Sequence, residues 1–272
     1  MSKTKIEWTE YSWNPVSGCT PISEGCQNCY ARRMAKRLRG RCGYPADEPF
    51  KVTLHPEKLA EPLKWRKPRK IFACSMGDLF HESVPESWIL AVYTAMEKCP
   101  QHTFLILTKR IHRAAEVLNK FTGRSWPLPN VWLGVTAENQ QRADERIPIL
   151  LEIPAAVRFV SVEPMLGPIR LQRDWLMCPG GAEYGHGMSL TRVHAGGCCD
   201  RHPRIHWVIC GSESGPNHRK TKIEWIRDLR EQCISANVPF FLKQMEINGR
   251  MVKMPELDGK IWAQFPEVQY AS

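Results

Sequence analysis

Short apolar runs alternate with longer amphipathic stretches along most of the chain. Each apolar run ends at a polar or glycine-containing turn, a pattern typical of the buried strands of parallel sheets. Strands are therefore predicted at 11–13, 50–54, 71–74, 103–107, 131–135, 157–162, 206–210 and 238–242. Helices are predicted at 31–38, 87–99, 111–120, 138–151 and 223–236, where apolar residues recur at helical spacing.

This alternation predicts an α/β protein built from βα units around a parallel sheet. The number of strands favours a (β/α) barrel of the TIM-like kind, closed or partly closed, as one domain over residues 1–272. An open doubly wound sheet is the alternative, but the sequence lacks the glycine-rich turn of dinucleotide-binding folds. Residues 171–205 interrupt the rhythm and are interpreted as an insert.

Three cysteines, Cys19, Cys26 and Cys29, follow the first predicted strand with the spacing C-x6-C-x2-C. Thiolates favour zinc, copper(I) or iron–sulfur clusters. A structural zinc site needs four ligands, and no second C-x2-C pair follows. Three thiolates can instead hold three irons of a [4Fe–4S] cluster and leave the fourth iron open. A zinc knuckle with a distant fourth ligand, or thiols without metal, are the alternatives.

Polar residues end the later predicted strands. These residues are Asp78, Lys109, Glu138, Glu163, Glu213 and Lys243. In parallel barrels the carboxyl ends of the strands form the rim where ligands bind. The cysteine loop also follows a strand, so we expect it at the same rim. The competing interpretation is that loops after strands are polar in any protein.

The chain has 272 residues, with 38 basic and 28 acidic side chains and a net charge of +10. This excess favours a polyanionic partner such as DNA. The start of the chain has no apolar signal core, and no apolar run is long enough to span a membrane. Eleven cysteines without such a signal predict thiols or metal ligands in a reducing cytoplasm rather than disulfides.

Two clusters of basic residues are candidate nucleic-acid contacts. One lies on the helix that follows the cysteine loop and consists of Arg32, Arg33, Lys36 and Arg37. The other surrounds a tryptophan and consists of Lys64, Arg66, Lys67 and Arg69. Such clusters bind phosphates without reading sequence. The alternative is a solvated charged face with no partner.

The insert is rich in potential metal ligands. It contains Cys178, His186, His194, Cys198, Cys199 and His202 among glycines. Cys178, Cys198, Cys199 and His202 are the candidate ligands of a second metal, and their mixture of thiol and imidazole groups favours zinc. The spacing matches no standard zinc motif, so a lid with incidental cysteines and histidines is the alternative.

A cysteine triad after the first strand of a (β/α) barrel resembles the radical S-adenosylmethionine enzymes. The whole chain resembles a family of phage and prophage proteins of unknown function. The segments that carry this resemblance are 6–9, 13–15, 19–30, 78–81, 107–110, 132–135, 158–164, 211–215 and 239–244. Two features differ: the common radical-enzyme spacing is C-x3-C-x2-C, and residues 211–213 read Gly-Ser-Glu where Gly-Gly-Glu is expected.

The resemblance implies that the three cysteines hold a [4Fe–4S] cluster whose open iron binds S-adenosylmethionine. One electron from an external donor would then generate a 5′-deoxyadenosyl radical, which abstracts a substrate hydrogen. Carboxylates at the rim are expected to hold the cofactor's ammonium or ribose, and Thr108, Lys109 and Lys243 its carboxylate or the substrate. The expected cofactor contacts are Asp78, Thr108, Lys109, Glu138, Glu163, Gly211, Glu213, Ser214 and Lys243.

The basic surface and the resemblance together predict an enzyme that modifies a base in DNA, which requires a single-stranded or flipped base. The specific expectation is rearrangement of an amino-acid-decorated thymine in phage DNA hypermodification. Repair of a thymine photolesion by the same chemistry is the nearest alternative. A zinc- or cluster-stabilised nucleic-acid-binding module, and a magnesium nuclease using Glu138 and Glu163, are alternatives from other classes.

Overall fold

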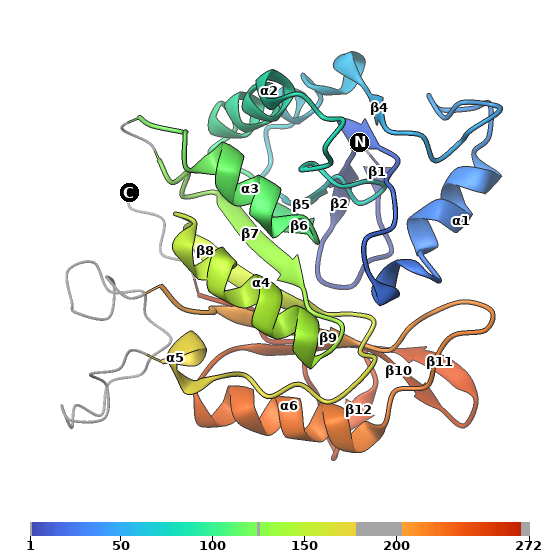
Figure 1. The fold of residues 1–272 in the computed structure, drawn as a ribbon, viewed down its shortest axis with the longest axis vertical. Helices are drawn as coiled ribbons and strands as arrows, with labels where there is room; N and C mark the ends of the chain where they lie inside the picture. The colour runs from blue at the N-terminus through green and yellow to red at the C-terminus, as the bar shows by residue number, and fades with distance from the viewer. Residues whose placement is uncertain (1, 124–125, 178–202, 268–272) are drawn as a thin grey trace.

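The computed structural model describes residues 2–123, 126–177 and 203–267, and its centre is one nine-stranded sheet (Figure 1). In spatial order the strands are β1 (Ser2–Lys3), β2 (Tyr11–Trp13), β5 (Lys70–Ala73), β6 (Thr103–Thr108), β7 (Val131–Thr136), β8 (Val157–Val162), β9 (Trp207–Gly211), β10 (Phe240–Ile247) and β11 (Arg250–Lys253). Strands β2 to β10 run parallel in this order, and β1 and β11 pair antiparallel at the two edges. The predicted βα units are thereby confirmed.

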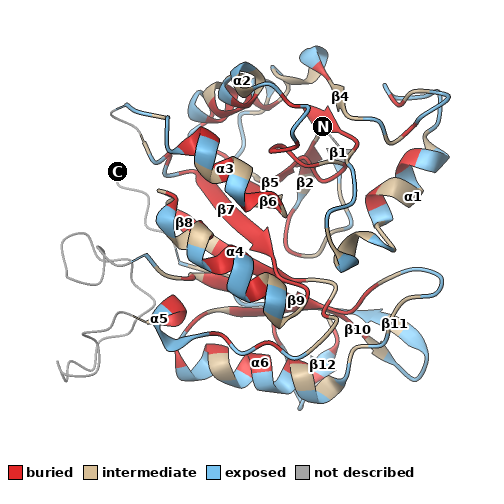
Figure 2. Ribbon diagram, viewed as in Figure 1, coloured by how far each residue is buried: buried red, intermediate tan, exposed pale blue. Residues whose placement is uncertain are grey.

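The helices cover the outer face of the sheet (Figure 1). They are α1 (Tyr30–Arg37), α2 (Glu86–Glu97), α3 (Ile111–Leu118), α4 (Gln140–Glu152), α5 (Arg173–Leu176) and α6 (Ile223–Ser235). On α2, α3, α4 and α6 the buried side chains face the sheet and the exposed ones face away (Figure 2). This one-sided burial explains why the sequence of these helices is amphipathic and could be recognised as helical. Within the described residues, no helix is both long and apolar enough to cross a bilayer.

The inner face of the sheet encloses an aromatic core. The Trp8 ring lies 4.7 Å from the Phe72 ring of β5 and 6.3 Å from the Trp207 ring of β9. These strands are four positions apart, which in a flat sheet would separate them by about 19 Å. The sheet therefore curls around Trp8 into a half-barrel. Among the described residues β1 and β11 do not pair, so the barrel is partly closed, one of the two predicted forms.

One predicted strand is wrong. Residues 50–54 were expected in the barrel, but β4 (Thr53–Leu54) pairs antiparallel with β3 (Val16–Ser17) in a separate two-stranded sheet. Both residues of β4 are partly exposed, and Pro56 follows at once, so the segment is too short and too polar for a central strand. It supports the cysteine loop from below, since Phe50 O accepts a hydrogen bond from Cys19 N at 3.2 Å.

The sequence pattern also missed a hairpin at the far edge. Strand β10 continues beyond the predicted 238–242 and turns into β11. The turn is Asn248-Gly249, both with positive φ, which is the combination that two-residue hairpins favour. A second short hairpin, β12 (Glu256–Leu257) and β13 (Lys260–Ile261), follows it.

Candidate functional site

A cavity of about 1080 Å³, measured up to its opening to solvent, lies at the carboxyl ends of the strands. All three cysteines of the predicted motif line it. The predicted cofactor contacts that also line it are Asp78, Thr108, Lys109, Glu163, Glu213, Ser214 and Lys243. The structure therefore brings together, from six different loops, most of the residues singled out in the sequence. Glu138 and Gly211 do not line the cavity.

The cysteine loop is fixed at its start by Gly18. Its φ is +83°, and a Cβ there would lie 2.1 Å from Lys51 O, so no other residue fits without rearrangement. Gly18 N donates to Met76 O at 2.9 Å. The chain then passes Cys19, forms a single 3₁₀ turn at Glu24–Cys26, and enters α1 directly after Cys29.

Glu138 holds the middle of this loop from behind. Its carboxylate accepts hydrogen bonds from Ser23 Oγ and from Gly25 N, the latter at 3.3 Å. It also pairs with Arg146 Nη1 at 2.9 Å, and both side chains are almost completely buried. The donors that surround Glu138 are thus all from the protein. Its predicted contact with a cofactor stays a prediction, and the geometry assigns it a positioning role.

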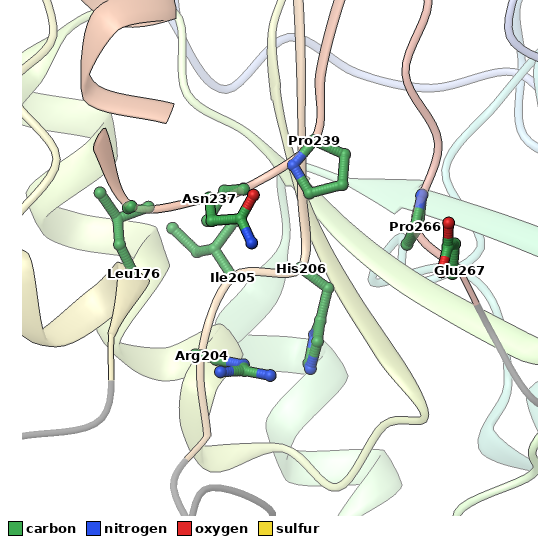
Figure 3. A pocket seen from close by; sticks show the side chains of 10 residues that line it. Leu176, Arg204, Ile205, His206, Asn237, Pro239, Pro266 and Glu267 are labelled. Atoms are coloured by element: carbon green, nitrogen blue, oxygen red, sulfur yellow. The ribbon is translucent and has the colours of Figure 1, made fainter. Parts of the chain in front are cut away.

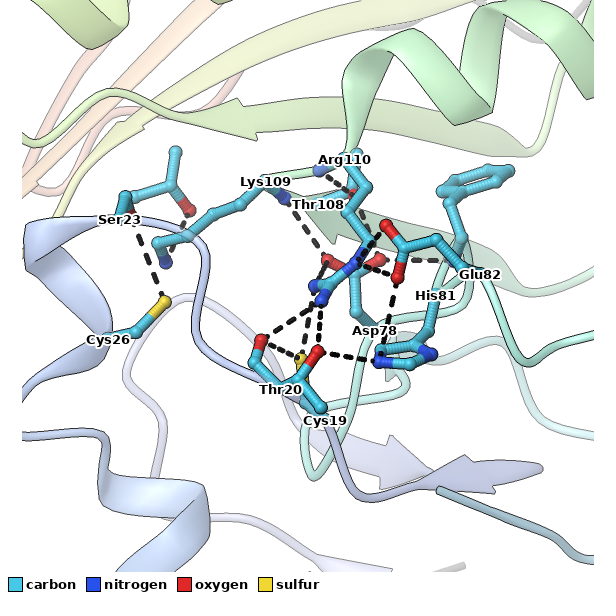
Figure 4. A network of polar contacts seen from close by, with 12 residues as sticks. Cys19, Thr20, Ser23, Cys26, Asp78, His81, Glu82, Thr108, Lys109 and Arg110 are labelled. Atoms are coloured by element: carbon cyan, nitrogen blue, oxygen red, sulfur yellow. Dashed lines mark hydrogen bonds and ion pairs between the residues drawn. The ribbon is translucent and has the colours of Figure 1, made fainter. Parts of the chain in front are cut away.

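Asp78 and Arg110 hold the start of the loop (Figure 4). The guanidinium of Arg110 lies 3.6 Å from the Asp78 carboxylate and 3.0 Å from that of Glu82. Its Nη2 donates to the carbonyl and the hydroxyl of Thr20, both at 2.9 Å, and its Nη1 donates to Cys19 Sγ at 3.2 Å. Arg110 was not among the predicted site residues.

The Asp78 carboxylate is itself fixed from β6. It accepts from Thr108 Oγ1 at 2.8 Å and from Lys109 N at 3.2 Å. It also accepts from Phe80 N at 3.0 Å. The Thr108 hydroxyl is therefore bonded to Asp78 although the residue lines the cavity, and its predicted contact with a cofactor carboxylate or the substrate stays a prediction.

Glu213 holds the end of the loop. It accepts from Asn28 Nδ2 at 2.9 Å and from the backbone and side chain of Arg219. Burial alone would raise the pKa of Glu213, but the hydrogen bonds from Arg219 and Asn28 outweigh it and lower the pKa to about 2. The carboxylate is therefore charged at neutral pH and committed to these donors.

The first turn of α1 is latched to the same segment. Arg33 donates to Asn28 O at 2.8 Å and to Ser214 O at 3.0 Å. Gly215 has a φ of +104°, and a Cβ there would meet the Arg33 guanidinium at 2.5 Å. Arg33 is thus a structural contact between the cysteine loop and the loop after β9, although it was predicted to contact nucleic acid.

Two further charged residues line the cavity without holding the cysteine loop. Glu163 and Lys243 form an ion pair with each other, with 18% and 17% of their side chains exposed. Ser161 lies two residues before Glu163, lines the cavity, and has no side-chain hydrogen bond to another described residue. Sequence reasoning missed Ser161, although alternation along β8 places it on the same face as Phe159 and Glu163.

The cavity also has a cationic and an apolar part. Lys109 Nζ lies 3.3 Å from Thr136 Oγ1. Burial raises the pKa of Cys26, but the Lys109 charge and nearby backbone donors outweigh it, so the net pKa is lowered. Trp8 and Phe72 form an aromatic floor, and no described residue accepts a hydrogen bond from the Trp8 indole N–H.

The thiols are not arranged around a single ion. Among the described residues, no group of three or more Cys, His, Asp or Glu side chains lies close enough to hold one metal ion. Burial and the charge of Asp78 raise the pKa of Cys19 to about 11, so this thiol is protonated at neutral pH without metal. Metal binding would displace that proton.

The two predicted basic clusters lie at opposite ends of the strands, one at the carboxyl ends and one at the amino ends. Lys36 and Arg37 are exposed on α1, next to the cavity. Lys64, Arg66 and Lys67 are exposed near the amino end of β5, whereas the cavity lies at the carboxyl ends. Arg69 is sandwiched 3.8 Å from the Trp65 ring and 4.1 Å from that of Tyr11. Arg32 lies 5.7 Å from the Phe50 ring. The α1 cluster is thus the better placed of the two.

A second hollow of about 430 Å³ lies at the amino ends of β9 and β10 (Figure 3). His206 lines it, and burial lowers the pKa of this imidazole to about 3, so it is neutral. Its Nδ1 accepts a hydrogen bond from Arg158 N at 3.0 Å, which makes it a paired structural histidine. The candidate ligands of a second metal, Cys178, Cys198, Cys199 and His202, lie outside the described residues.

Comparison with known proteins gives one family and one kind of structure. The family model described as "Protein of unknown function (DUF5131)" matches residues 3–266. A spore photoproduct lyase mutant with bound AdoMet and dinucleoside spore photoproduct has a TM-score of 0.46 at 14% identity, covering 85% of this chain and 62% of that one. Another mutant of that lyase gives 0.44 at 13%. The chain spans less than two thirds of those proteins. It matches no curated protein.

Proposed function

The chain belongs to the DUF5131 family, and we propose that it is an enzyme that uses a [4Fe–4S] cluster and S-adenosylmethionine to modify a nucleobase. One observation carries the proposal. Three cysteines of a single loop line one large cavity at the carboxyl ends of the strands of a parallel half-barrel, together with the Glu163–Lys243 ion pair. That edge is where enzymes of parallel-barrel architecture place their chemistry.

The donor set fits a cluster better than a single ion. Cys19, Cys26 and Cys29 would each bind a different iron, so they need not converge on one point. This agrees with the lack of a single-ion site in the described part of the chain. A fourth iron would have no protein ligand from the motif. When bound, the cluster supplies the electron that cleaves the sulfonium of S-adenosylmethionine and starts hydrogen-atom abstraction.

The protein's own contribution to this chemistry is to hold the loop rigid. Asp78, Glu138 and Glu213 anchor its start, middle and end through charge-assisted hydrogen bonds. A rigid loop keeps the three thiolates in position while substrate enters and leaves. Lys109, whose charge acts on Cys26, is the residue we assign to the carboxylate of S-adenosylmethionine.

We assign the Glu163–Lys243 pair to the substrate. Among the described residues each of the two side chains is the other's ion-pair partner, and this pair can exchange partners with a ligand that carries both an amine and a carboxylate. An amino-acid-decorated thymine has both groups. Trp8 and Phe72 line the cavity and offer apolar contacts to its ring. Exposed Lys36 and Arg37 would bind the flanking phosphates.

The test of the cofactor proposal is formation of 5′-deoxyadenosine. The protein is purified without oxygen, reconstituted with iron and sulfide, reduced, and given S-adenosylmethionine. We expect cleavage by the wild type and none by Cys26→Ala. Cys42→Ala is the matched control, because Cys42 is an exposed free cysteine outside the motif and should be silent. Equal cleavage by wild type and Cys26→Ala, or tightly bound zinc in place of a cluster, would overturn the proposal in favour of a binding module.

The test of the substrate uses single-stranded oligonucleotides. One carries an amino-acid-decorated thymine and another a thymine photolesion, and the nucleosides are analysed by mass spectrometry after reaction. Rearrangement would change retention but not mass, whereas repair would restore two thymines. Cleavage of S-adenosylmethionine with neither oligonucleotide altered would remove the assigned substrates and leave the cofactor chemistry standing.

A further inference from the structure

The three motif cysteines differ in what approaches their sulfur atoms. Cys19 Sγ receives a hydrogen bond from the Arg110 guanidinium at 3.2 Å (Figure 4). Among described side chains, only the Ser23 hydroxyl is within hydrogen-bond distance of Cys26 Sγ, at 3.8 Å, while backbone N–H groups and the charge of Lys109 also act on this thiol. Cys29 Sγ has no hydrogen bond to a side chain in the described part of the chain. The cationic donor is therefore specific to one of the three ligands.

The guanidinium cannot easily leave this position. Only 3% of the Arg110 side chain is exposed. Its Nε donates to both carboxylate oxygens of Glu82 at 3.0 Å. Its Nη2 donates to the carbonyl oxygen and the hydroxyl oxygen of Thr20. Its backbone N–H donates to Thr108 Oγ1 at 2.8 Å, which fixes the start of α3 beneath it. The guanidinium is thus held by the cysteine loop and by the loop after β5.

Arg110 both anchors the loop and contacts the sulfur. The bonds from Nε to Glu82 and from Nη2 to Thr20 fix the plane of the guanidinium, which is rigid. That plane directs Nη1 at Cys19 Sγ, so the residue that anchors the loop is also a donor to one of its thiols. Hydrogen bonds to ligating sulfurs and nearby positive charge withdraw electron density from an iron–sulfur cluster and favour its reduced form.

We propose that Arg110 raises the reduction potential of the cluster by donating a charge-assisted hydrogen bond to Cys19 Sγ. The inference rests on the proposed function. The step concerned is the transfer of one electron from an external one-electron donor to the cluster: the donor is oxidised, the cluster is reduced, and no bond is made or broken. Arg110 stabilises the added negative charge. Glu82, bonded to Nε, and the buried Asp78 carboxylate, 3.6 Å from Nη1, weaken that effect by partly neutralising the guanidinium.

The test is a redox titration of the reconstituted protein, followed by electron paramagnetic resonance. We expect Arg110→Gln to lower the ratio of reduced to oxidised cluster about tenfold at a fixed solution potential, which is a shift of about 59 mV to more negative values for one electron. Arg110→Lys keeps the charge and should fall between the two. Arg113→Gln is the matched control, since Arg113 lies on α3 and pairs with Glu86 away from the cysteines.

A second variant protects the test against loss of the fold. Glu82 is 63% exposed, so Glu82→Gln leaves the core intact and frees the charge of Arg110. It should move the potential in the opposite direction, to more positive values. If Arg110→Gln binds no cluster, the sign of the Glu82→Gln shift decides.

The outcomes separate this inference from the proposed function. A wild-type protein that binds no cluster overturns the function itself. A wild-type cluster whose potential is unchanged by Arg110→Gln, or by Glu82→Gln where Arg110→Gln fails to load, overturns only the role of Arg110. Iron content and the visible spectrum of each variant establish which case applies.

Discussion

Charged residues at the carboxyl ends of the strands fall into two groups with different bonding states. Asp78, Glu138 and Glu213 support the cysteine loop, and each accepts several hydrogen bonds from the protein. Glu163 and Lys243 line the cavity, pair with each other among the described residues, and are 18% and 17% exposed. All of these residues follow strands of one sheet, and in the sequence nothing distinguishes them.

The difference shows that a strand-end carboxylate can serve either the fold or a ligand, and that burial decides which. A carboxylate with no exposed surface and three protein donors has no remaining capacity for a ligand. A pair that keeps some exposure can exchange its partner at little cost. The carboxylates that support the cysteine loop are therefore interpreted as scaffold, and the Glu163–Lys243 pair as a binding surface.

The largest expected effect is a loss of stability when a carboxylate that supports the cysteine loop is removed. Glu138→Gln should lower the free energy of unfolding by about 3–5 kcal/mol, because it leaves the buried Arg146 guanidinium without its counter-charge. Denaturation by urea measures this. Glu24→Gln is the matched control: Glu24 pairs with Arg142 on the surface, and its loss should cost no more than about 1 kcal/mol. Similar losses from both variants would erase the distinction between scaffold and surface.

The next effect is a dependence of stability on pH. The pKa of Glu213 is about 2 in the folded protein and near its ordinary 4.5 when unfolded. A carboxyl with a depressed pKa stabilises the fold above its unfolded pKa and loses that contribution as pH falls through the folded value. We therefore expect stability to fall between about pH 5 and 2, and Glu213→Gln to flatten this part of the curve. Identical acid curves for both proteins would show that Glu213 is not held as described.

For the Glu163–Lys243 pair the expected effect is on ligand binding instead of stability. Glu163→Gln and Lys243→Met should each change the free energy of unfolding by no more than about 1 kcal/mol, since the pair is partly exposed. Each should weaken binding of the decorated thymine at least tenfold, because the remaining partner meets only one of its two charges. Equilibrium binding with the reconstituted protein measures this. Tight binding by both variants would remove the pair from the substrate site.

The smallest effect per residue concerns the outer surface beside the cavity. Replacing Lys36 and Arg37 by Gln should reduce the slope of log affinity against log salt by about 1.4 for single-stranded DNA, about 0.7 for each lost phosphate contact. Lys64→Gln with Lys67→Gln, at the other edge of the sheet, should leave the slope unchanged. Fluorescence anisotropy with a labelled oligonucleotide gives both slopes. A larger change from the second pair would move the DNA path to the far edge.

Much of the fold could be predicted because the sheet is buried on both faces. A parallel strand such as β6 or β7 is apolar along its whole length, and its helix shows one apolar stripe, so both periods were legible. The strand predicted at 50–54 was wrong because a short alternating run can form any small sheet. The hairpin of β10 and β11 was signalled by Asn248-Gly249, but the mostly polar residues around it obscured the strands.

The sequence could predict which residues lie at the site but not which hydrogen bonds they make. The sequence indicated which residues stand at the rim, since strand ends of one sheet meet at one edge. It could not indicate that Glu138 turns toward Ser23 and Gly25, or that Arg110 reaches Cys19, because these partners are far apart in the chain. Such pairings depend on how the loops fold over the edge. Ser161 was missed because a serine inside an apolar run resembles an ordinary strand residue.

The spread of the loop's anchors along the chain sets an order of events during synthesis. The cysteines belong to the first residues made, yet Glu213, which holds Asn28, is made near the end. Trp8 likewise waits for Trp207 before its core can close. Because chains emerge from the amino end and distant contacts form late, the thiols leave the ribosome long before their supports exist. The cysteine loop therefore reaches its folded form only after the chain is complete, and until then its thiols are exposed to solvent and to oxygen.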